Sequence, residues 1–323
     1  MSTNLEKATN IKKSNIKKRR SARSRKALMT GLIFALPWLF GFLVFQLYPI
    51  VASAFYSFTN FNLFQKPQMV GFSNYTTLFS DHQFWQSLYN TIYMTVIGVP
   101  ISLIIALICA LTLNFKVRGQ SIYRAVFFLP TMVPVVPATF LWLWLLNGQY
   151  GAINLVLHWF GINGPLWMQS PDWTKPSLIL MGLWLNGSTI MIYLAALQEV
   201  PDMYYEAAEI DGAGWWKKFW HITWPAVSPI TLFQLVIGII GAFQYFTQVF
   251  IMTSSSSTSS ISTAAGGPSN SLLLYPLYLF QNAFTFFKMG SASAMAWIMF
   301  IITMLVSLII LLSSKKWVYY GGE

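Results

Sequence analysis

Six apolar runs of membrane-spanning length constrain the fold of this chain more than any other feature. A helix needs about 20 apolar residues to cross roughly 30 Å of hydrocarbon, and a backbone in that environment must satisfy its own hydrogen bonds. Only 9% of the 323 residues are charged, whereas a soluble protein carries about 25%. The sequence therefore predicts an all-α membrane protein with six transmembrane helices. The runs are residues 28–51, 88–113, 123–146, 177–197, 230–252 and 291–312.

The third of these runs is unusual because it contains Pro130, Pro134 and Pro137. Each proline lacks a backbone N–H and crowds the preceding turn of a helix. Neighbouring helices can satisfy the carbonyl groups that are freed in this way. We therefore expect the third span to be a kinked helix rather than a straight one.

Lys and Arg residues are distributed very unevenly between the loops. Cytoplasmic loops of membrane proteins carry an excess of these residues. All but three of the 20 Lys and Arg lie in the N-terminal tail (residues 1–27), around the loop after the second run, in the central loop, or in the C-terminal tail (residues 314–323). The three exceptions are Lys66, Lys175 and Lys288. This distribution predicts that both termini and the central loop are cytoplasmic.

The basic N-terminal tail accounts for most of the net charge of +11. Its few apolar residues predict disorder, and its charge suits an anionic membrane surface. A basic tail beside a first membrane span is a topology signal, so the charge does not require a nucleic-acid partner. The first apolar run is longer than the roughly 7–15 residues of a secretory signal core, which predicts an uncleaved anchor.

The central loop, between the fourth and fifth runs, is the longest charged and helix-prone segment of the chain. Pro201 suits the first turn of a helix, where its missing N–H costs little, and residues 203–210 are good helix formers. Asp211 and Gly212 then supply a turn, because glycine accepts a positive φ where a helix must stop. The pattern predicts a helix that ends at Gly212.

A second amphipathic piece follows this turn. Trp215, Phe219 and Ile222 lie on one face of the expected helix, and we expect Pro225 and Pro229 to end it before the fifth span. The loop is then a helix–turn–helix against the membrane, with small alanines that allow another protein to approach closely. A plain solvated connector is the alternative on physical grounds alone.

The central loop resembles the EAA loop of permease subunits from binding-protein-dependent ABC importers. In that family the loop is a coupling helix that docks into a cleft on a cytoplasmic ATPase. The resemblance implies a type I ABC importer permease fold, with the coupling loop at residues 199–229. The matching residues are Glu206, Ala207, Ala208, Asp211, Gly212, Ala213, Phe219, Ile222, Pro225 and Pro229.

Other stretches resemble the carbohydrate-uptake members of this family, the maltose, glycerol-phosphate and multiple-sugar permeases. They include residues 70–75, 84–91, 123–130 and 315–320, and the resemblance covers about residues 30–320. It implies a permease transmembrane domain at 85–313, preceded by a first transmembrane helix and an external segment at 28–84. The Ser/Thr-rich run at 253–263 looks like an insertion after the fifth span and is flexible by composition.

The resemblance also implies a set of partners. These are a second, similar permease, two ATPase subunits that hold ATP and Mg, an extracytoplasmic solute-binding protein, and a sugar or oligosaccharide. The chain would be a multi-pass protein of the cytoplasmic membrane of a bacterium or archaeon, in contact with lipid and with no nucleic acid.

The sequence itself provides little catalytic chemistry. It has no phosphate-binding loop of the Walker A type, and His82, His158 and His221 lie on separate loops, which makes a shared metal site improbable. We therefore expect neither an enzyme nor a bound cofactor. A secondary transporter or channel for a small polar solute is the alternative function, but it would need charged residues within the spans. A membrane scaffold or enzyme subunit would leave the coupling loop unexplained.

Neutral polar and aromatic residues within the spans are the candidates for the substrate path. They are Asn186 in the fourth run, and Gln244, Tyr245 and Gln248 in the fifth. Gln244 and Gln248 are expected to stack at i and i+4 on one helix face. Such groups suit a polyhydroxylated solute, and hydrogen bonds between helices are the alternative interpretation.

Overall fold

The computed structural model describes residues 29–115, 118–255 and 266–319. Within these ranges the secondary structure is helical apart from one isolated β-bridge, between Thr59 and Met69. The all-α prediction is confirmed for the part of the chain that is described. The N-terminal tail and most of the Ser/Thr-rich run lie outside it.

The chain divides into two compact units, residues 1–56 and 57–323. The described part of the first unit, residues 29–56, belongs to a single apolar helix, Met29–Ser57. This helix includes the π-helical turn η1 (Leu43–Leu47) and then α2 (Tyr48–Ser57). Its 29 residues are enough to cross a membrane at about 1.5 Å per residue. The helix runs six residues beyond the predicted end of the first span because its apolar character continues.

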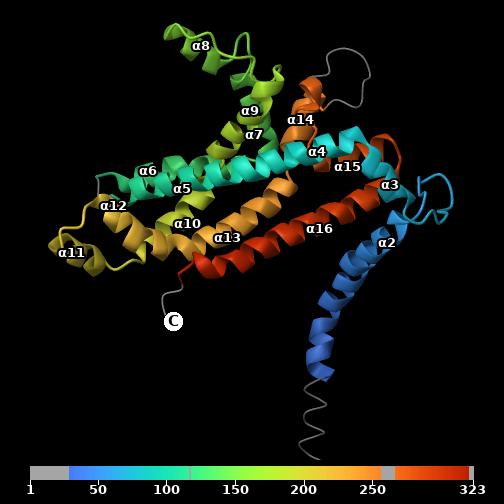
Figure 1. Ribbon diagram of the computed structural model, residues 1–323, viewed down its shortest axis with the longest axis horizontal. Helices are drawn as coiled ribbons and strands as arrows, with labels where there is room; N and C mark the ends of the chain where they lie inside the picture. Colours follow the sequence, from blue (N-terminus) through green and yellow to red (C-terminus); the bar gives the residue numbers. More distant parts are fainter. Residues whose placement is uncertain (1–28, 116–117, 256–265, 320–323) are drawn as a thin grey trace, which may run out of the picture. The chain divides into compact units, whose positions relative to one another are not determined.

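The second unit contains three further helical stretches that are long and apolar enough to cross a membrane (Figure 1). They are His82–Asn114, Trp215–Ser254 and Met289–Lys316. Two bent helix pairs also qualify, so by length and composition the described residues hold four candidate spans, or up to six if each bent pair is one span.

The remaining bounds define the labels used below. In chain order the elements are α3 (Ser73–Ser80), α4 (His82–Tyr93), η2 (Met94–Gly98), α5 (Val99–Asn114), α6 (Gln120–Phe128), η3 (Leu129–Met132), α7 (Val135–Leu145), α8 (Ala152–Trp159), α9 (Pro171–Trp184), α10 (Gly187–Gln198), α11 (Asp202–Ile210), α12 (Trp215–Lys218), η4 (Phe219–Thr223), α13 (Trp224–Phe243), α14 (Thr247–Ser255), η5 (Pro268–Asn270), α15 (Tyr275–Phe280), η6 (Gln281–Thr285), α16 (Met289–Ser313) and η7 (Ser314–Lys316).

The proline-rich third run is broken rather than merely kinked. Its two halves, Gln120–Met132 and Val135–Leu145, meet at 101°. Val133 has an extended backbone (φ −77°, ψ 125°), which is the conformation that a residue before proline prefers. Pro134 is extended as well, with ψ 145°. Two successive extended residues end one helix and start another in a new direction.

The expectation that Pro225 and Pro229 separate the amphipathic piece from the fifth span is wrong. The elements α12, η4 and α13 form one uninterrupted helix through both prolines. Pro225 lies in the first turn of α13, directly after the π-helical turn η4. Pro229 cannot donate to the carbonyl of Pro225, but the Ser228 hydroxyl donates to that oxygen instead at 2.7 Å. A side chain thus replaces the missing backbone hydrogen bond.

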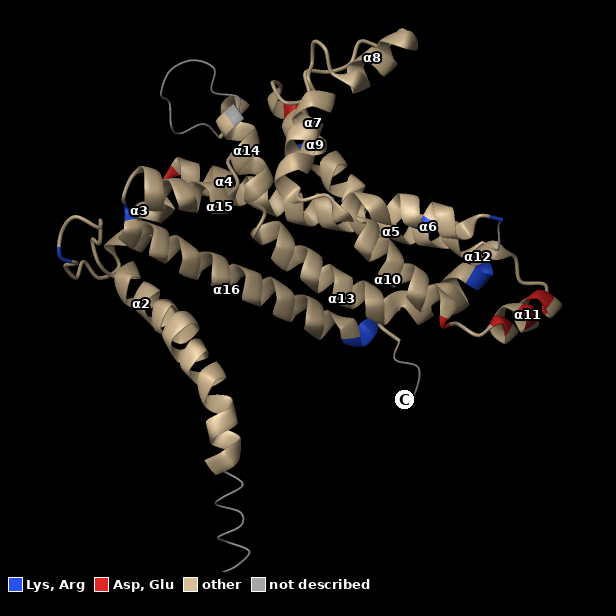
Figure 2. Ribbon diagram, turned by 180° about the vertical axis from the view of Figure 1, so that it is seen from behind, with Lys and Arg blue, Asp and Glu red and all other residues tan. Residues whose placement is uncertain are grey.

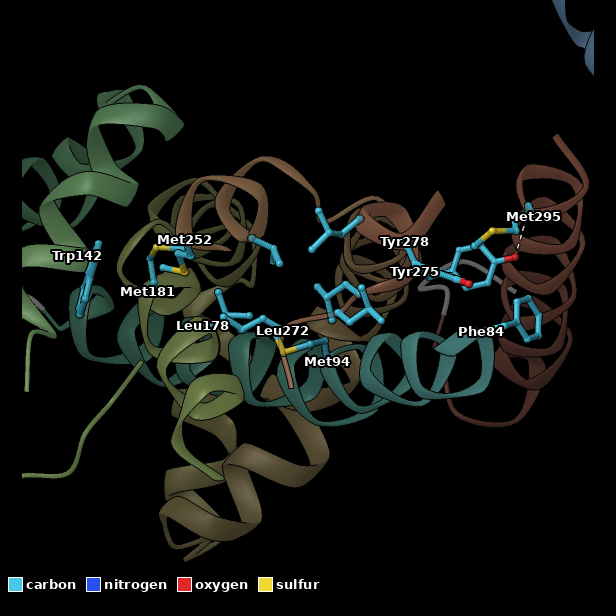
Figure 3. Close-up of a cluster of buried hydrophobic side chains, with 14 of the residues drawn as sticks. Phe84, Met94, Trp142, Leu178, Met181, Met252, Leu272, Tyr275, Tyr278 and Met295 are labelled. Atoms are coloured by element: carbon cyan, nitrogen blue, oxygen red, sulfur yellow. Dashed lines mark hydrogen bonds between the residues drawn. The ribbon is translucent and has the colours of Figure 1, made fainter. Parts of the chain in front are cut away.

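The helices of the second unit pack through two main apolar clusters. One joins α5, α10 and the start of α13, and it includes Leu107, Tyr193 and Val227. The other, drawn in Figure 3, involves α4 and α15, which lie towards the end of the bundle opposite α11 (Figure 1). It is centred on residues 271–283, called here the buried segment, in which almost every side chain is buried.

Hydrogen bonds from three helices hold the buried segment in place. The Asn90 amide on α4 donates to the carbonyls of Asn270 and Leu273, at 2.9 and 3.0 Å. Thr174 on α9 donates to Ser271 at 2.8 Å. The Tyr275 hydroxyl donates to the backbone of Met295 on α16 at 2.8 Å (Figure 3).

A tyrosine and a carboxylate form a hydrogen bond in the same region. The Tyr278 hydroxyl donates to Asp81, whose other oxygen accepts the backbone N–H of Gln83 and so caps α4. Burial, together with this hydrogen bond to a carboxylate, raises the pKa of Tyr278 to about 12. The tyrosine therefore stays protonated and acts as a donor at neutral pH.

Candidate functional site

The first candidate site is the coupling loop, residues 199–229. Its helix α11 follows Pro201 and carries Asp202 in the first turn, where a negative charge is favourable beside the helix dipole. None of the residues of α11 is buried. Glu206 and Ala207 are exposed and Ala208 is half-buried, so this half of the motif lies on the surface.

A glycine turn ends α11 as the sequence predicts. Gly212 has a φ of +72°, and its N–H donates to the carbonyl of Glu209 at 3.0 Å. The N–H of Ala213 donates to the carbonyl of Ala208 at 2.8 Å. These two bonds are the pattern of a Schellman motif, which satisfies the last carbonyls of a helix. No atom lies within 4 Å of the position of an added Cβ at Gly212, so its φ angle alone demands glycine.

Two side-chain contacts join the two halves of the loop into a hairpin. The Lys218 ammonium pairs with the Glu209 carboxylate at 2.7 Å, and the hydroxyls of Tyr205 and Thr223 lie 3.0 Å apart. Figure 2 shows acidic residues on α11 opposite basic residues near α12. Most of the surface of α11 makes no such contact, which leaves it available to a partner.

The second half of the motif faces inward. Phe219 packs against the cluster between α5 and α10 and stacks on Trp215, with ring centroids 5.6 Å apart. Ile222, Pro225 and Pro229 line a groove of about 1040 Å³ beside α11. The motif residues therefore divide into an exposed set on α11 and a packed set that anchors the loop to the bundle.

The second candidate site is a cavity of about 320 Å³ between η2, α5, α9, α10 and α13. Its lining contains no charged residue. The polar side chains that reach it include Ser102, Asn186, Thr189, Gln234 and Tyr245. Four glycines also line it, which are Gly98, Gly182, Gly238 and Gly241.

Two of the predicted path residues, Asn186 and Tyr245, line this cavity. Asn186 lies at the 53° bend between α9 and α10 and donates to the carbonyl of Ser102 at 2.8 Å. The Tyr245 hydroxyl is buried and has no hydrogen-bond partner among the described residues. Since an unpaired buried hydroxyl costs free energy, Tyr245 is suited to receive a polar ligand group or water.

The other two predicted path residues, Gln244 and Gln248, do not line the cavity. The expected i, i+4 stacking of their side chains is wrong because the helix is interrupted between them. α13 ends at Phe243, Gln244 has φ −104° and ψ 11° as its cap, and α14 begins at Thr247. Gln244 is exposed and Gln248 is half-buried.

The sequence analysis did not select Gln234 and Gly238 for the path, although the signal was present. Together with Gly241 and Tyr245 they follow an i, i+4, i+7, i+11 spacing, which is one face of a helix. An added Cβ at Gly238 would lie 2.8 Å from Val99, so this glycine lets α13 approach the η2–α5 helix closely. That stripe of small and polar residues marks the wall of the cavity.

The described residues of the second unit thus form a bundle of membrane-length helices that presents an exposed helical hairpin, the central loop. Residues 98–318, which are more than half of the chain, match the family described as "binding-protein-dependent transport system inner membrane component". The chain belongs to this family and is an integral membrane permease of the ABC transporter type.

Individual relatives match over nearly the whole chain. The probable ABC transporter permease protein YesP of Bacillus subtilis (strain 168) is 41% identical, over 94% of this chain and 96% of the relative. The sulfoquinovosyl glycerol transport system permease protein SmoG of Agrobacterium fabrum (strain C58 / ATCC 33970) is 33% identical, over 82% and 83% of the two chains.

The fold is similar to that of a solved transporter. A chain of the bacterial alginate ABC transporter, in complex with an alginate pentasaccharide-bound periplasmic protein, superposes with a TM-score of 0.74. The match covers 91% of this chain and 96% of the other, at 21% identity. The chain thus has the type I ABC importer permease fold that the resemblance of its central loop implies.

Proposed function

We propose that this chain is one of two permease subunits of an ATP-driven importer that translocates a sugar or oligosaccharide. An extracytoplasmic binding protein delivers the substrate, and two ATPase subunits hold ATP and Mg. The permease crosses the cytoplasmic membrane of a bacterium or archaeon six times, with both termini and the coupling loop in the cytoplasm. The single observation that carries this proposal is the exposed helix α11 joined by a glycine turn to the helix that lines the cavity.

The continuity of that helix supports a mechanism of coupling. From Trp215 to Phe243 the chain is one helix, and Gln234 and Gly238 within it line the cavity. When an ATPase subunit moves α11, the hairpin contacts between its two halves transmit the movement to α12 and so to α13. The cavity then opens alternately to the two sides of the membrane.

The chemistry of the cavity supports a sugar as the substrate. Neutral amides and hydroxyls match the donors and acceptors of a polyhydroxylated solute, and the apolar walls suit its ring faces. Relatives carry names of this class, such as the lactose transport system permease protein LacF of Rhizobium radiobacter, 34% identical over 90% of this chain and 94% of the relative. The six predicted spans contain no His, Asp or Glu, which agrees with energy supplied by a separate ATPase.

The coupling step is tested by Gly212→Val, with Gly214→Val as the matched control. Valine at Gly212 must adopt a positive φ, which costs roughly 1–2 kcal/mol for a β-branched residue. Gly214 is equally exposed but has φ −67° and ψ 169°, which valine tolerates. In reconstituted complexes we expect Gly212→Val to reduce uptake and substrate-stimulated ATPase activity by about tenfold, and Gly214→Val to leave both near the parental value. Parental uptake by Gly212→Val would refute the coupling role.

The substrate path is tested by removing single polar groups. Tyr245→Phe deletes only the hydroxyl that has no partner among the described residues, and we expect uptake to weaken by about three- to tenfold with complex yield unchanged. Gln244→Ala and Gln248→Ala test whether the path extends beyond the cavity towards α14. If these two residues act as structural hydrogen-bonding groups instead, complex yield or thermal stability falls before uptake does. Unchanged uptake for all three variants would remove them from the path.

A further inference from the structure

A single lysine lies between two tyrosine rings near one end of the cavity. Lys175 on α9 places its ammonium nitrogen 5.1 Å from the ring centroid of Tyr89 and 5.1 Å from that of Tyr93. Both distances lie within the range of cation–π attraction. The two tyrosines are four residues apart on α4 and therefore share one face of that helix.

The position of this cluster follows from the helices that carry it. Lys175 precedes Leu178 and Ile179 by one turn on α9, and both of these residues line the cavity. Tyr93 directly precedes Met94, which lines the cavity from η2. The chain reaches the coupling loop through the opposite end of the α9–α10 pair. Lys175 and the two tyrosines therefore lie beyond the end of the cavity that is farther from the coupling loop, and none of the three lines the cavity itself.

The charge of Lys175 is held in place without being neutralised. In the part of the chain that the structure describes, no carboxylate lies within ion-pair distance of the Lys175 ammonium group. The contacts of this group are with the two tyrosine rings. Asp172 lies one turn away on α9 and is exposed. A ring quadrupole orients an ammonium ion but leaves its net charge of +1 and its N–H groups available. Lys175 is half-buried, so it would bind an anion more strongly than a fully solvated lysine does.

The cavity differs from this cluster in charge, because none of the residues that line the cavity is charged. A substrate that enters from this end meets one fixed positive charge, flanked by flat aromatic faces, before it meets neutral groups. Tyr89 is 62% exposed, so a sugar ring can stack against it while an acidic substituent reaches the ammonium. Charge-assisted hydrogen bonds of this kind are stronger than neutral ones.

We infer that Lys175 is a specificity-determining residue that binds the carboxylate or sulfonate group of an acidic saccharide beyond this end of the cavity, with Tyr89 and Tyr93 as the aromatic platform that positions it. The inference rests on the proposed sugar-import function and narrows its substrate class. It involves no covalent step.

The test uses the complete importer, with its partner permease, ATPases and binding protein, reconstituted in liposomes. Uptake is measured for matched pairs of acidic and neutral disaccharides: a glucuronide and the glucoside, a galacturonide and the galactoside, and a mannuronide and the mannoside. We expect the parental complex to import at least one acidic member. Lys175→Gln should reduce that uptake by about tenfold at subsaturating concentration, whereas Lys175→Arg should stay within about twofold of the parent.

Matched controls separate recognition from folding. Lys288→Gln removes another lysine that the charge distribution places on the same side of the membrane, but this exposed side chain contacts neither tyrosine, so acidic uptake should be unchanged. Tyr93→Phe keeps the ring and should behave like the parent, whereas Tyr93→Leu removes it and should lower acidic uptake about threefold. Uptake of any imported neutral member should not respond to Lys175→Gln.

Three outcomes would overturn the inference in different ways. If Lys175→Gln lowers complex yield, or lowers neutral and acidic uptake equally, Lys175 is a membrane-interface anchor. If the parental complex imports neutral saccharides alone, the inference fails while the proposed function stands. If no member of any pair is imported, the proposed sugar function fails together with it.

Discussion

Helix α11 and the buried segment both join longer helices, yet their surroundings are opposite. In α11 no residue is buried, and Ile210 is 87% exposed. In the buried segment Leu274 is fully buried, and hydrogen bonds reach the region from α4, α9 and α16. The buried segment is called here the frame. Helix α11 is called the lever, because the proposed coupling function requires it to move with a partner. A segment that is bonded from several sides stays fixed, whereas a segment held mainly by its own turn can follow a partner.

The largest expected contrast comes from the same kind of truncation at both sites. Leu274→Ala should destabilise the protein by about 2–5 kcal/mol, because it leaves a cavity in a packed cluster. Ile210→Ala removes a side chain that is mostly in solvent, so unfolding should change by less than about 0.5 kcal/mol. Thermal unfolding of the purified permease subunit, without the ATPase subunits that are proposed to dock on α11, measures both. Equal destabilisation by the two variants would contradict the division into frame and lever.

A smaller effect is expected from a single polar side chain of the frame. Asn90→Ala leaves the buried carbonyls of Asn270 and Leu273 without their amide donor, which should cost about 2 kcal/mol. The control is Gln86→Ala, one turn earlier on α4. Its amide donates to Ser269 at 2.9 Å in an exposed position, where water can replace it. Chemical denaturation should therefore detect Asn90→Ala and leave Gln86→Ala close to the parent.

The smallest effect is expected at the ion pair within the lever. Glu209 is mostly exposed, and exposed pairs contribute about 0–1 kcal/mol. Glu209→Gln should thus shift thermal unfolding only slightly, and raising the salt concentration should have a similar effect on the parent because salt screens the pair. A large decrease in the unfolding temperature of Glu209→Gln would show that the hairpin contributes to the stability of the fold, as the frame does.

Most of the helical framework could be predicted from sequence because its causes are local. Apolar runs of membrane length predict helices wherever they occur, and the first, second and sixth predicted spans each lie almost entirely within one continuous helix. The fourth bends by 53° at Asn186, and the fifth is interrupted after Phe243. The third was predicted to bend, and the extended residues Val133 and Pro134 break it more sharply than expected. The glycine turn at Gly212 was also predictable, since one residue with a positive φ suffices to end the helix.

Two predictions were wrong because each used one local sequence pattern and ignored the neighbouring residues that determine the backbone. Pro229 looked like a helix end, but the hydroxyl of Ser228 supplies the missing hydrogen bond and the helix continues. The predicted stack of Gln244 and Gln248 assumed an unbroken helix, and the chain interrupts it between them. Neither feature can be judged from spacing alone.

The sequence by itself determined that this protein is helical and membrane-spanning, where most of its helices lie, and where its central loop turns. These properties depend on the composition of single segments and on the backbone freedom of single residues. Tertiary structure alone decided that the Asn186 amide donates to the Ser102 carbonyl in the cavity wall and that the Lys175 ammonium lies over the rings of Tyr89 and Tyr93. The physical reason is that each contact joins residues more than 80 positions apart, so it depends on how each helix is rotated and packed against its neighbours.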